Sequence, residues 1–220
     1  MKRRIIKIIS LLFIVLLVFE IYYFFKSSKI NYIALGDSIV LGLNNYGEID
    51  YSYTDYLKDY LNSNKNLAYY KKYAKQDNRI EDILEDIKYK MELKKDLRES
   101  NLVTISIGMR DLLDEKNVDN MVLDMDKCIN EIRKYAKQKL IIIGYYNQES
   151  LLDIEKDKKF AYIDNKMMEI SSKYNAKYIP LYELFKNNKN YLNNSKLPNL
   201  VGQKAIYNLI LDYINEKNLH

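Results

Sequence analysis

The sequence has one cysteine and one histidine among its 220 residues. Cys128 lies among apolar residues at helical spacing, so we expect it to be buried. A single cysteine excludes an intrachain disulfide and a thiolate metal cluster. The only histidine, His220, is the last residue of the chain. The carboxylates show no calcium-loop spacing, so we predict neither a metal site nor a cofactor.

The chain after residue 29 also has no excess of positive charge. Six of the 35 basic residues and one of the 30 acidic residues precede residue 30. The rest of the chain holds 29 of each, so the formal net charge of +5 belongs to the N-terminal segment. We therefore predict no nucleic-acid partner. A hydrophobic content of 48% is enough for one globular domain after that segment.

Residues 8–25 form an apolar run whose length suits a helix crossing ~30 Å of hydrocarbon. Four basic residues precede the run, and only Lys26 and Lys29 follow it closely, which favours a cytoplasmic N-terminus. A cleaved signal peptide is the alternative, but no small-x-small cleavage site follows. We predict a single-pass anchor in residues 1–29 that holds the chain in the cytoplasmic membrane, and an extracytoplasmic domain over residues 30–220.

After the anchor, short apolar runs alternate with amphipathic stretches, as is typical of a parallel sheet with helices on both faces. The predicted strands are 32–35, 68–73, 102–107, 140–144 and 177–179. The predicted helices are 53–62, 80–97, 118–136, 159–174 and 201–215. Right-handed crossovers then predict an α/β domain, a three-layer sandwich with a five-stranded parallel sheet. Residues 187–195 are expected to be a polar loop.

Gly36-Asp37-Ser38 follows the first predicted strand, at the sheet edge where open α/β domains bind their ligands. A serine on this strand-to-helix turn lies near the backbone amides that follow, and this geometry suits a nucleophile. A serine that simply caps a helix in a tight turn is the alternative interpretation.

The stretch 32–42, YIALGDSIVLG, resembles the first sequence block of the SGNH/GDSL hydrolases. The segment 108–111, GMRD, is similar to their Gly-x-Asn-Asp block, with Arg110 at the asparagine. Pro198, Asn199 and Gly202 match the block that precedes the last helix. The resemblance covers residues 31–217 and implies the SGNH-hydrolase fold, which is flavodoxin-like.

Several positions of the family's catalytic machinery are replaced. Asn194 and Leu197 occupy the positions of the aspartate and the histidine, and Asp77 aligns with the glycine of the second block. In the family, the serine attacks an ester or amide carbonyl, and the histidine removes its proton. The serine amide, the glycine and the asparagine form the oxyanion hole. The resemblance thus implies a catalytic role for Ser38 alone, and a serine hydroxyl without a base in reach is a poor nucleophile.

We expect Ser38, Asp77, Gly108 and Arg110 to line a ligand-binding crevice. A guanidinium in the crevice would be a permanently charged donor, able to hold a carboxylate, phosphate or sulfate-like group. The alternative is that Arg110 pairs with Asp77 or Asp111. We read Asp111, with Asp114 and Glu115, as a solvated helix start.

Two kinds of replacement base exist in the sequence. His220 would reach Ser38 only if the chain end folded back across the domain. Asp37 or Asp77 would be a weak base for an alcohol at an ordinary carboxyl pKa of about 4. Tyr145 and Tyr146 follow the fourth strand, so we expect them to border the crevice, where aromatic rings suit an envelope glycan.

Two functions follow from different classes. The first is a catalytically degenerate SGNH-like domain, anchored in the membrane, that binds or scaffolds components of the cell envelope. The second is a divergent serine esterase or acyltransferase, for example a polysaccharide O-acetyl esterase, with Ser38 as nucleophile. A plain anchor-and-spacer role is favoured only if side chains fill the crevice.

Overall fold

The computed structural model describes residues 12–20, 22, 29–65, 67–114, 117–147 and 154–216. Residues 12–20 are helical, but most of the other residues of the predicted anchor lie outside the described ranges. None of the helices formed by described residues is long and apolar enough to span a membrane. The anchor over residues 8–25 therefore stays a prediction.

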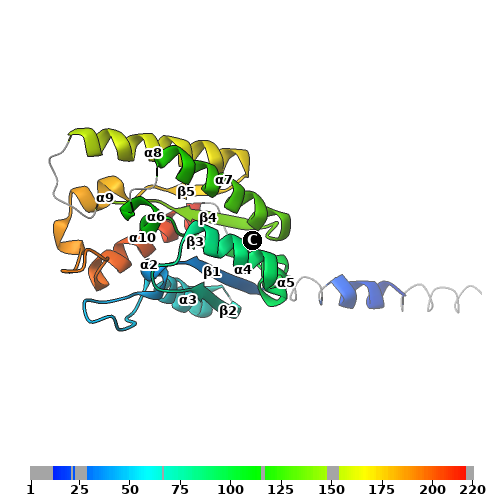
Figure 1. The fold of residues 1–220 in the computed structure, drawn as a ribbon. Coiled ribbons are helices and arrows are strands. Elements are labelled where there is room, and N and C mark those ends of the chain that lie inside the picture. The colour runs from blue at the N-terminus through cyan, green and yellow to red at the C-terminus, as the bar shows by residue number, and fades with distance from the viewer. Residues whose placement is uncertain are drawn as a thin grey trace, which may run out of the picture.

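Five parallel strands form one sheet in the order β2-β1-β3-β4-β5, which confirms the predicted sheet (Figure 1). Their bounds are β1 Ile30–Gly36, β2 Leu67–Ala74, β3 Leu102–Ser106, β4 Lys139–Ile143 and β5 Lys177–Ile179. The central strands β1, β3 and β4 are almost wholly buried because helices cover both faces of the sheet.

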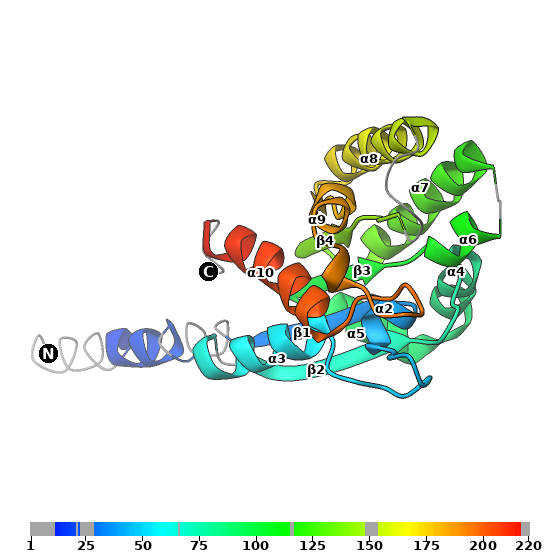
Figure 2. The same cartoon turned by 90° about the vertical axis from the view of Figure 1, so that its left-hand side faces the viewer.

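Helices form the two outer layers of the domain (Figure 2). Their bounds are α2 Ser38–Leu41, α3 Tyr53–Asn64, α4 Ile80–Tyr89, α5 Met91–Glu99, α6 Met109–Leu113, α7 Val118–Tyr135, α8 Ile154–Lys173, α9 Tyr182–Lys186 and α10 Leu200–Glu216, with a 3-10 helix η1 at Lys189–Tyr191. α3 packs against α10 on one face, whereas α7 packs against α4, α5 and α8 on the other. This arrangement is the predicted three-layer sandwich.

The single helix predicted over residues 80–97 is wrong, because α4 and α5 are separate helices that meet at Lys90. The backbone of Lys90 is extended, with φ −93° and ψ 103°. The break has a packing reason. Ile87 and Leu93, both buried, are six residues apart, a spacing that does not keep them on one face of a continuous helix.

Two smaller expectations also need correction. Residues 187–195 contain η1, and Leu192 forms an isolated antiparallel bridge with Pro198, so this segment is more ordered than a plain polar loop. Asp111 is buried and accepts a hydrogen bond from the Ile80 N–H at 3.2 Å. It therefore joins α6 to the start of α4 instead of forming a solvated helix start.

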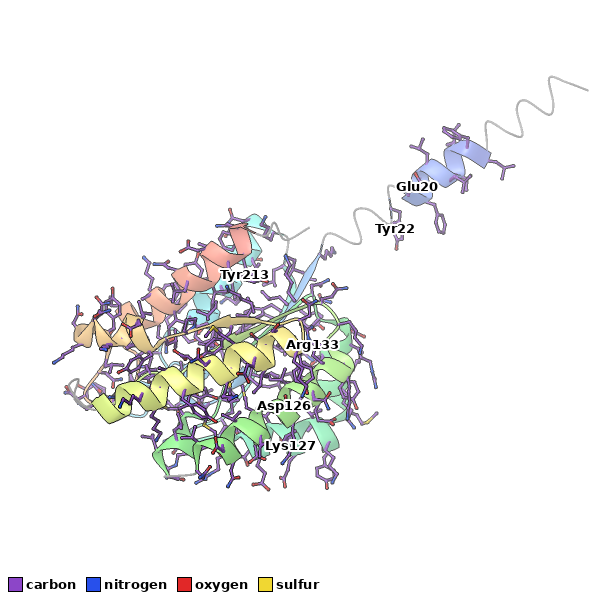
Figure 3. All side chains as sticks on the ribbon, turned by 90° about the horizontal axis from the view of Figure 1, so that it is seen from above. Glu20, Tyr22, Asp126, Lys127, Arg133 and Tyr213 are labelled. Atoms are coloured by element: carbon purple, nitrogen blue, oxygen red, sulfur yellow. The ribbon has the colours of Figure 1, made fainter. Side chains whose placement is uncertain are left out.

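At the amino edge of the sheet, side-chain bonds join α7 to the end of α8, and Figure 3 labels the two α7 residues that take part, Asp126 and Arg133. Arg133 donates to the carbonyls of Ala136 at 3.0 Å and Tyr174 at 2.7 Å, and Lys173 pairs with Asp126 at 2.9 Å. These bonds fix α7 against α8, whose chain continues into β5. This edge is structural, and the groups that carry chemistry lie at the opposite, carboxyl edge.

Candidate functional site

The turn after β1 places Ser38 at the first position of α2. A side chain at Gly36 would have its Cβ 2.0 Å from the Ser106 carbonyl of β3, so only glycine fits there. The Asp37 carboxylate accepts a hydrogen bond from the Ile39 N–H at 3.0 Å and caps α2. The interpretation of Ser38 as the capping residue is therefore wrong, because Asp37 has that role.

The Ser38 hydroxyl is held by the backbone of the loop after β2. The Asp77 N–H donates to Ser38 Oγ at 3.2 Å, and within the described ranges this is the only hydrogen bond of the hydroxyl. The hydroxyl oxygen acts as an acceptor in it. Ser38 thus lies in the crevice, and no described residue accepts a hydrogen bond from its hydroxyl.

Asp77 has the backbone conformation expected of the glycine that it replaces. Its φ is +54°, in the left-handed region that aspartate tolerates better than most residues. The Asn78 side chain donates to the Gly36 carbonyl at 3.0 Å and ties this loop to the end of β1. The N–H therefore points at the serine although the residue type differs. A backbone donor of the oxyanion-hole kind is retained, which residue types alone do not reveal.

Arg110 comes from α6, which begins after Gly108, a residue with φ +98°. Its guanidinium binds Asp114 twice, with Nη2–Oδ1 at 3.0 Å and Nε–Oδ2 at 3.2 Å. Nη1 also lies 4.0 Å from Asp77 Oδ1. Arg110 thus has one of its expected partners, Asp77, together with Asp114, which shares its helix face. Asp114 also binds Arg79, so two arginines and two aspartates form a cluster without net charge, and this weakens the attraction of Arg110 for an anionic ligand.

A cavity of about 40 Å³ contains the Ser38 side chain and is named the serine cavity below. It is lined by Asp37, Ser38, Ile39, Asp77, Met109, Arg110, Leu113 and Leu197. Leu197 thus lies beside the serine, as its alignment with the catalytic histidine implies, but an alkyl side chain accepts no proton. A volume of about 40 Å³ is well below the range typical of small-molecule sites.

The loop before α10 supports this wall. Asn193 is paired with Leu197 through both backbone and side chain, with the Leu197 N–H donating to the Asn193 carboxamide at 3.0 Å. Asn199 accepts hydrogen bonds from the Val201 and Gly202 N–H groups at 3.0 Å each and caps α10. Asn194 is exposed. The matched positions of this block therefore build the loop, while the replaced ones leave it without acid or base.

The Asp37 carboxylate in the serine cavity has an altered acidity. Burial raises its pKa to about 7, and the nearby carboxylates of Asp77 and Asp111 add to the effect. This value corrects the ordinary pKa that we expected for an aspartate at this position. The Asp37 carboxylate, however, is turned towards the Ile39 N–H, and no hydrogen bond joins it to Ser38 in the described part of the chain.

The expectation that Tyr145 and Tyr146 border the crevice is wrong, because both side chains are buried. Tyr146 stacks on Phe185 with ring centroids 4.5 Å apart, and its hydroxyl donates to the Lys196 carbonyl at 3.1 Å. They belong to the core under the site. His220 lies outside the described residues, and in those ranges no three metal-ligating side chains form a group.

A second cavity, which the sequence did not predict, lies beside the serine cavity. Its volume is about 320 Å³, and it lies between the loop of residues 42–51 and the start of α10. Residues 42–51 have neither helical nor strand periodicity, so no pattern in the sequence predicts a cavity there. The run of asparagine and tyrosine at 44–46 is the only local signal.

The comparisons with known proteins agree with this geometry. A model of the GDSL-like lipase/acylhydrolase family matches residues 34–201. A lipase from a goat rumen metagenome is similar in structure, with a TM-score of 0.72 and 20% identity, over 83% of this chain and 96% of that one. No curated protein matches the sequence.

Two bacterial enzymes show the same fold. An acetylxylan esterase from Geobacillus stearothermophilus has a TM-score of 0.64 and 14% identity, over 88% of this chain and 95% of that one. A lipase/acylhydrolase from Enterococcus faecalis has a TM-score of 0.65 and 19% identity, over 86% of this chain and 96% of that one. At these identities the structural similarity shows the fold alone. The chemistry has to be inferred from the geometry of the site.

Proposed function

This chain belongs to the GDSL-like lipase/acylhydrolase family, and we propose that it is a member that binds a cell-envelope ligand without hydrolysing an ester. One observation carries the proposal. The Ser38 hydroxyl accepts a hydrogen bond from the Asp77 N–H, and in the described ranges it donates to no base. Leu197 forms the wall of the serine cavity, in the position that the resemblance gives to the catalytic histidine.

A missing base has a large kinetic effect. Loss of the base or its orienting acid in a serine triad lowers kcat by about 10⁴-fold or more, because the hydroxyl must be deprotonated as it attacks. Two structures of the Geobacillus esterase are described as catalytic mutants in which a serine or a histidine is replaced by alanine. The only histidine of this chain is His220 at its end.

The proposed place of action is outside the cytoplasmic membrane, with residues 8–25 as the anchor. β1 begins at Ile30, next to the anchor in sequence, and Ser38 follows its carboxyl end. Seven strand residues rise about 20 Å. The crevice therefore lies at the end of the domain remote from residue 30, an arrangement that suits a ligand in the envelope better than a lipid headgroup.

The test is turnover of a chromogenic acetyl ester by the full-length chain in detergent. We expect the wild type and Ser38→Ala to give the same rate, equal to that of the buffer. Turnover that disappears in Ser38→Ala would overturn the proposal.

A divergent esterase is the second candidate, and the raised pKa of Asp37 favours it. A carboxylate with a pKa of about 7 is a much better base for an alcohol than an ordinary aspartate. Asp37→Asn separates the two candidates, since asparagine also caps a helix and keeps the turn intact. An esterase that uses Asp37 would lose its activity in this variant. A protein that only binds its ligand would show no ester turnover in either the wild type or Asp37→Asn.

A further inference from the structure

The cavity between residues 42–51 and the start of α10 is named the loop pocket here. Leu197 lines the serine cavity and Pro198 lines the loop pocket, so one dipeptide separates the two. Figure 2 shows the α2–α3 connection beside the segment that enters α10. The Gly42 N–H donates to the Ser38 carbonyl at 3.1 Å, which places the wall of the pocket one helical turn from the serine. A volume of about 320 Å³ is within the range of small-molecule sites.

The walls of the loop pocket are fixed by hydrogen bonds. The Asn44 carboxamide oxygen accepts from the Tyr46 N–H at 2.9 Å and the Glu48 N–H at 3.0 Å. The Asn45 carboxamide oxygen accepts from the Ser195 N–H at 3.1 Å and joins the two sides of the pocket. Each of these hydrogen bonds joins two groups of the protein and needs no ligand. The pocket is therefore formed before a ligand arrives, and binding orders little extra chain.

The lining of the loop pocket is almost uncharged, and most of the surface that it exposes is apolar. It contains four asparagines, one glutamine and two tyrosines, and Asp50 is its only charged residue. With no lysine or arginine among the described lining residues, the pocket does not attract an anion. The carboxamides of Asn199 and Gln203 donate within the protein, to the carbonyls of Asn190 at 2.7 Å and Ile39 at 3.1 Å. The amide nitrogen of Asn45 makes no hydrogen bond within the described ranges and can donate to a sugar hydroxyl.

Tyr46 supplies the aromatic surface that a sugar ring needs. Its side chain is 85% exposed, and its ring makes no contact with another ring in the described part of the chain. The amide nitrogen of its neighbour Asn45 makes no hydrogen bond within those ranges either. An exposed aromatic ring beside the Asn45 amide donor fits the C–H face of a pyranose ring together with one of its hydroxyl groups.

We propose that the loop pocket binds one or two pyranose rings of a neutral oligosaccharide, beside Ser38 and not over it. The inference rests on the proposed function, because it supplies the ligand for a domain that binds without hydrolysis. It also explains how the serine cavity can stay small while the domain keeps a binding site.

Isothermal titration calorimetry on the full-length chain tests this site. The protein is kept in a polyoxyethylene detergent, since a sugar headgroup would compete for the pocket. The probes are an N-acetylglucosamine tetramer and a xylose tetramer. We expect at least one of them to bind, Tyr46→Ala to raise its Kd at least tenfold, and Tyr46→Phe to stay within about twofold of the wild type. Tyr89→Ala, an exposed tyrosine on α4 across the sheet, is the matched control and should change nothing.

Three results would overturn the inference: failure of both tetramers to bind, equal affinity in Tyr46→Ala and the wild type, or binding of inorganic phosphate in their place. If Ser38→Ala or Arg110→Ala abolished sugar binding and Tyr46→Ala did not, the inference would fail while a binding function remained, at the serine cavity. Ser38-dependent ester turnover would instead refute the proposed function. The Tyr46 variants would then still decide whether the loop pocket holds the sugar.

Discussion

The serine cavity, lined by Leu197, and the loop pocket, lined by the adjacent Pro198, differ in size and in charge. The serine cavity has about 40 Å³ and is surrounded by two aspartates and an arginine that pairs with carboxylates. The loop pocket has about 320 Å³ and a lining of amides and tyrosines. The cavity around Ser38 is thus narrow, and no described residue accepts a hydrogen bond from the serine hydroxyl, while room for a ligand lies one helical turn away. Under the proposed function, the fold and the turn geometry persist without the reaction.

The strongest way to break this contrast is to rebuild the serine cavity. Arg110→Asn with Asn194→Asp and Leu197→His would restore the donor, acid and base types that the family resemblance implies, and the shorter asparagine would widen the cavity. Because the Asp77 N–H already points at Ser38, we expect ester turnover to rise at least ~10²-fold above the wild type. Rates on a chromogenic acetyl ester measure it.

Adding Ser38→Ala to the rebuilt variant is its control and should remove the gain. A folded triple variant with no turnover would show that Leu197 does not stand where a base can reach Ser38.

The pH dependence of stability tests whether the buried Asp37 carboxylate of the serine cavity titrates differently from an exposed carboxylate of the loop pocket. The pKa of Asp37 is about 7 in the fold and near ~4 in the unfolded chain, so the folded state binds the extra proton between these values. The free energy of unfolding contributed by this group is greatest below pH ~4 and falls as the pH rises to about 7, by up to roughly 4 kcal/mol. Asp37→Asn should flatten this slope and be the more stable protein at pH 7.

Urea unfolding of the wild type and Asp37→Asn at several pH values measures this slope. Asp50→Asn, at an exposed carboxylate of the loop pocket, is the matched control. Parallel curves for the wild type and Asp37→Asn would mean that Asp37 titrates normally.

Much of the fold follows from the sequence, because each strand of the sheet interior is a short apolar run buried on both faces. The meeting of Ser38, Asp77 and Arg110 follows as well, since the ends of parallel strands share one edge. Leu197 reaches the same cavity, as the spacing of the last block implies.

Other features depend on properties that residue types do not carry. The Asp77 donor depends on a backbone angle, and the break at Lys90 depends on which faces of α4 and α5 are buried. The partner Asp114, in contrast, was predictable, because residues four apart share a helix face. The loop pocket arises where two aperiodic segments meet, and no pattern in either segment specifies that meeting.

A smaller test concerns the loop pocket. Asn45→Ala removes the bond to the Ser195 N–H that joins its two walls. Because this bond is exposed, we expect a loss of about 0.5–1 kcal/mol in the free energy of unfolding. The affinity for the sugar tetramer should fall several-fold, as the pocket loses preorganisation together with a donor. Urea unfolding measures the change in stability, and calorimetry measures the change in affinity. An unchanged affinity would show that Asn45 does not contribute to binding of the sugar.

The smallest expected effect belongs to Arg110→Ala. The side chain is 41% exposed, and ion pairs of that kind contribute less than about 1 kcal/mol. Thermal unfolding should shift by only a few degrees, and sugar binding should not change. A large loss of sugar affinity would transfer the ligand to the serine cavity.

Labelling of Ser38 by an activated fluorophosphonate decides between a binding protein and an esterase, because a serine hydroxyl reacts with it at an appreciable rate only where a base activates the hydroxyl. The full-length wild type, Ser38→Ala and the rebuilt triple variant are exposed to it side by side, and the modified residue is located by mass spectrometry. We predict no label on Ser38 in the wild type and a label in the triple variant. Stoichiometric labelling of wild-type Ser38 would show that a base activates this serine. It would contradict the proposed function and favour an active hydrolase.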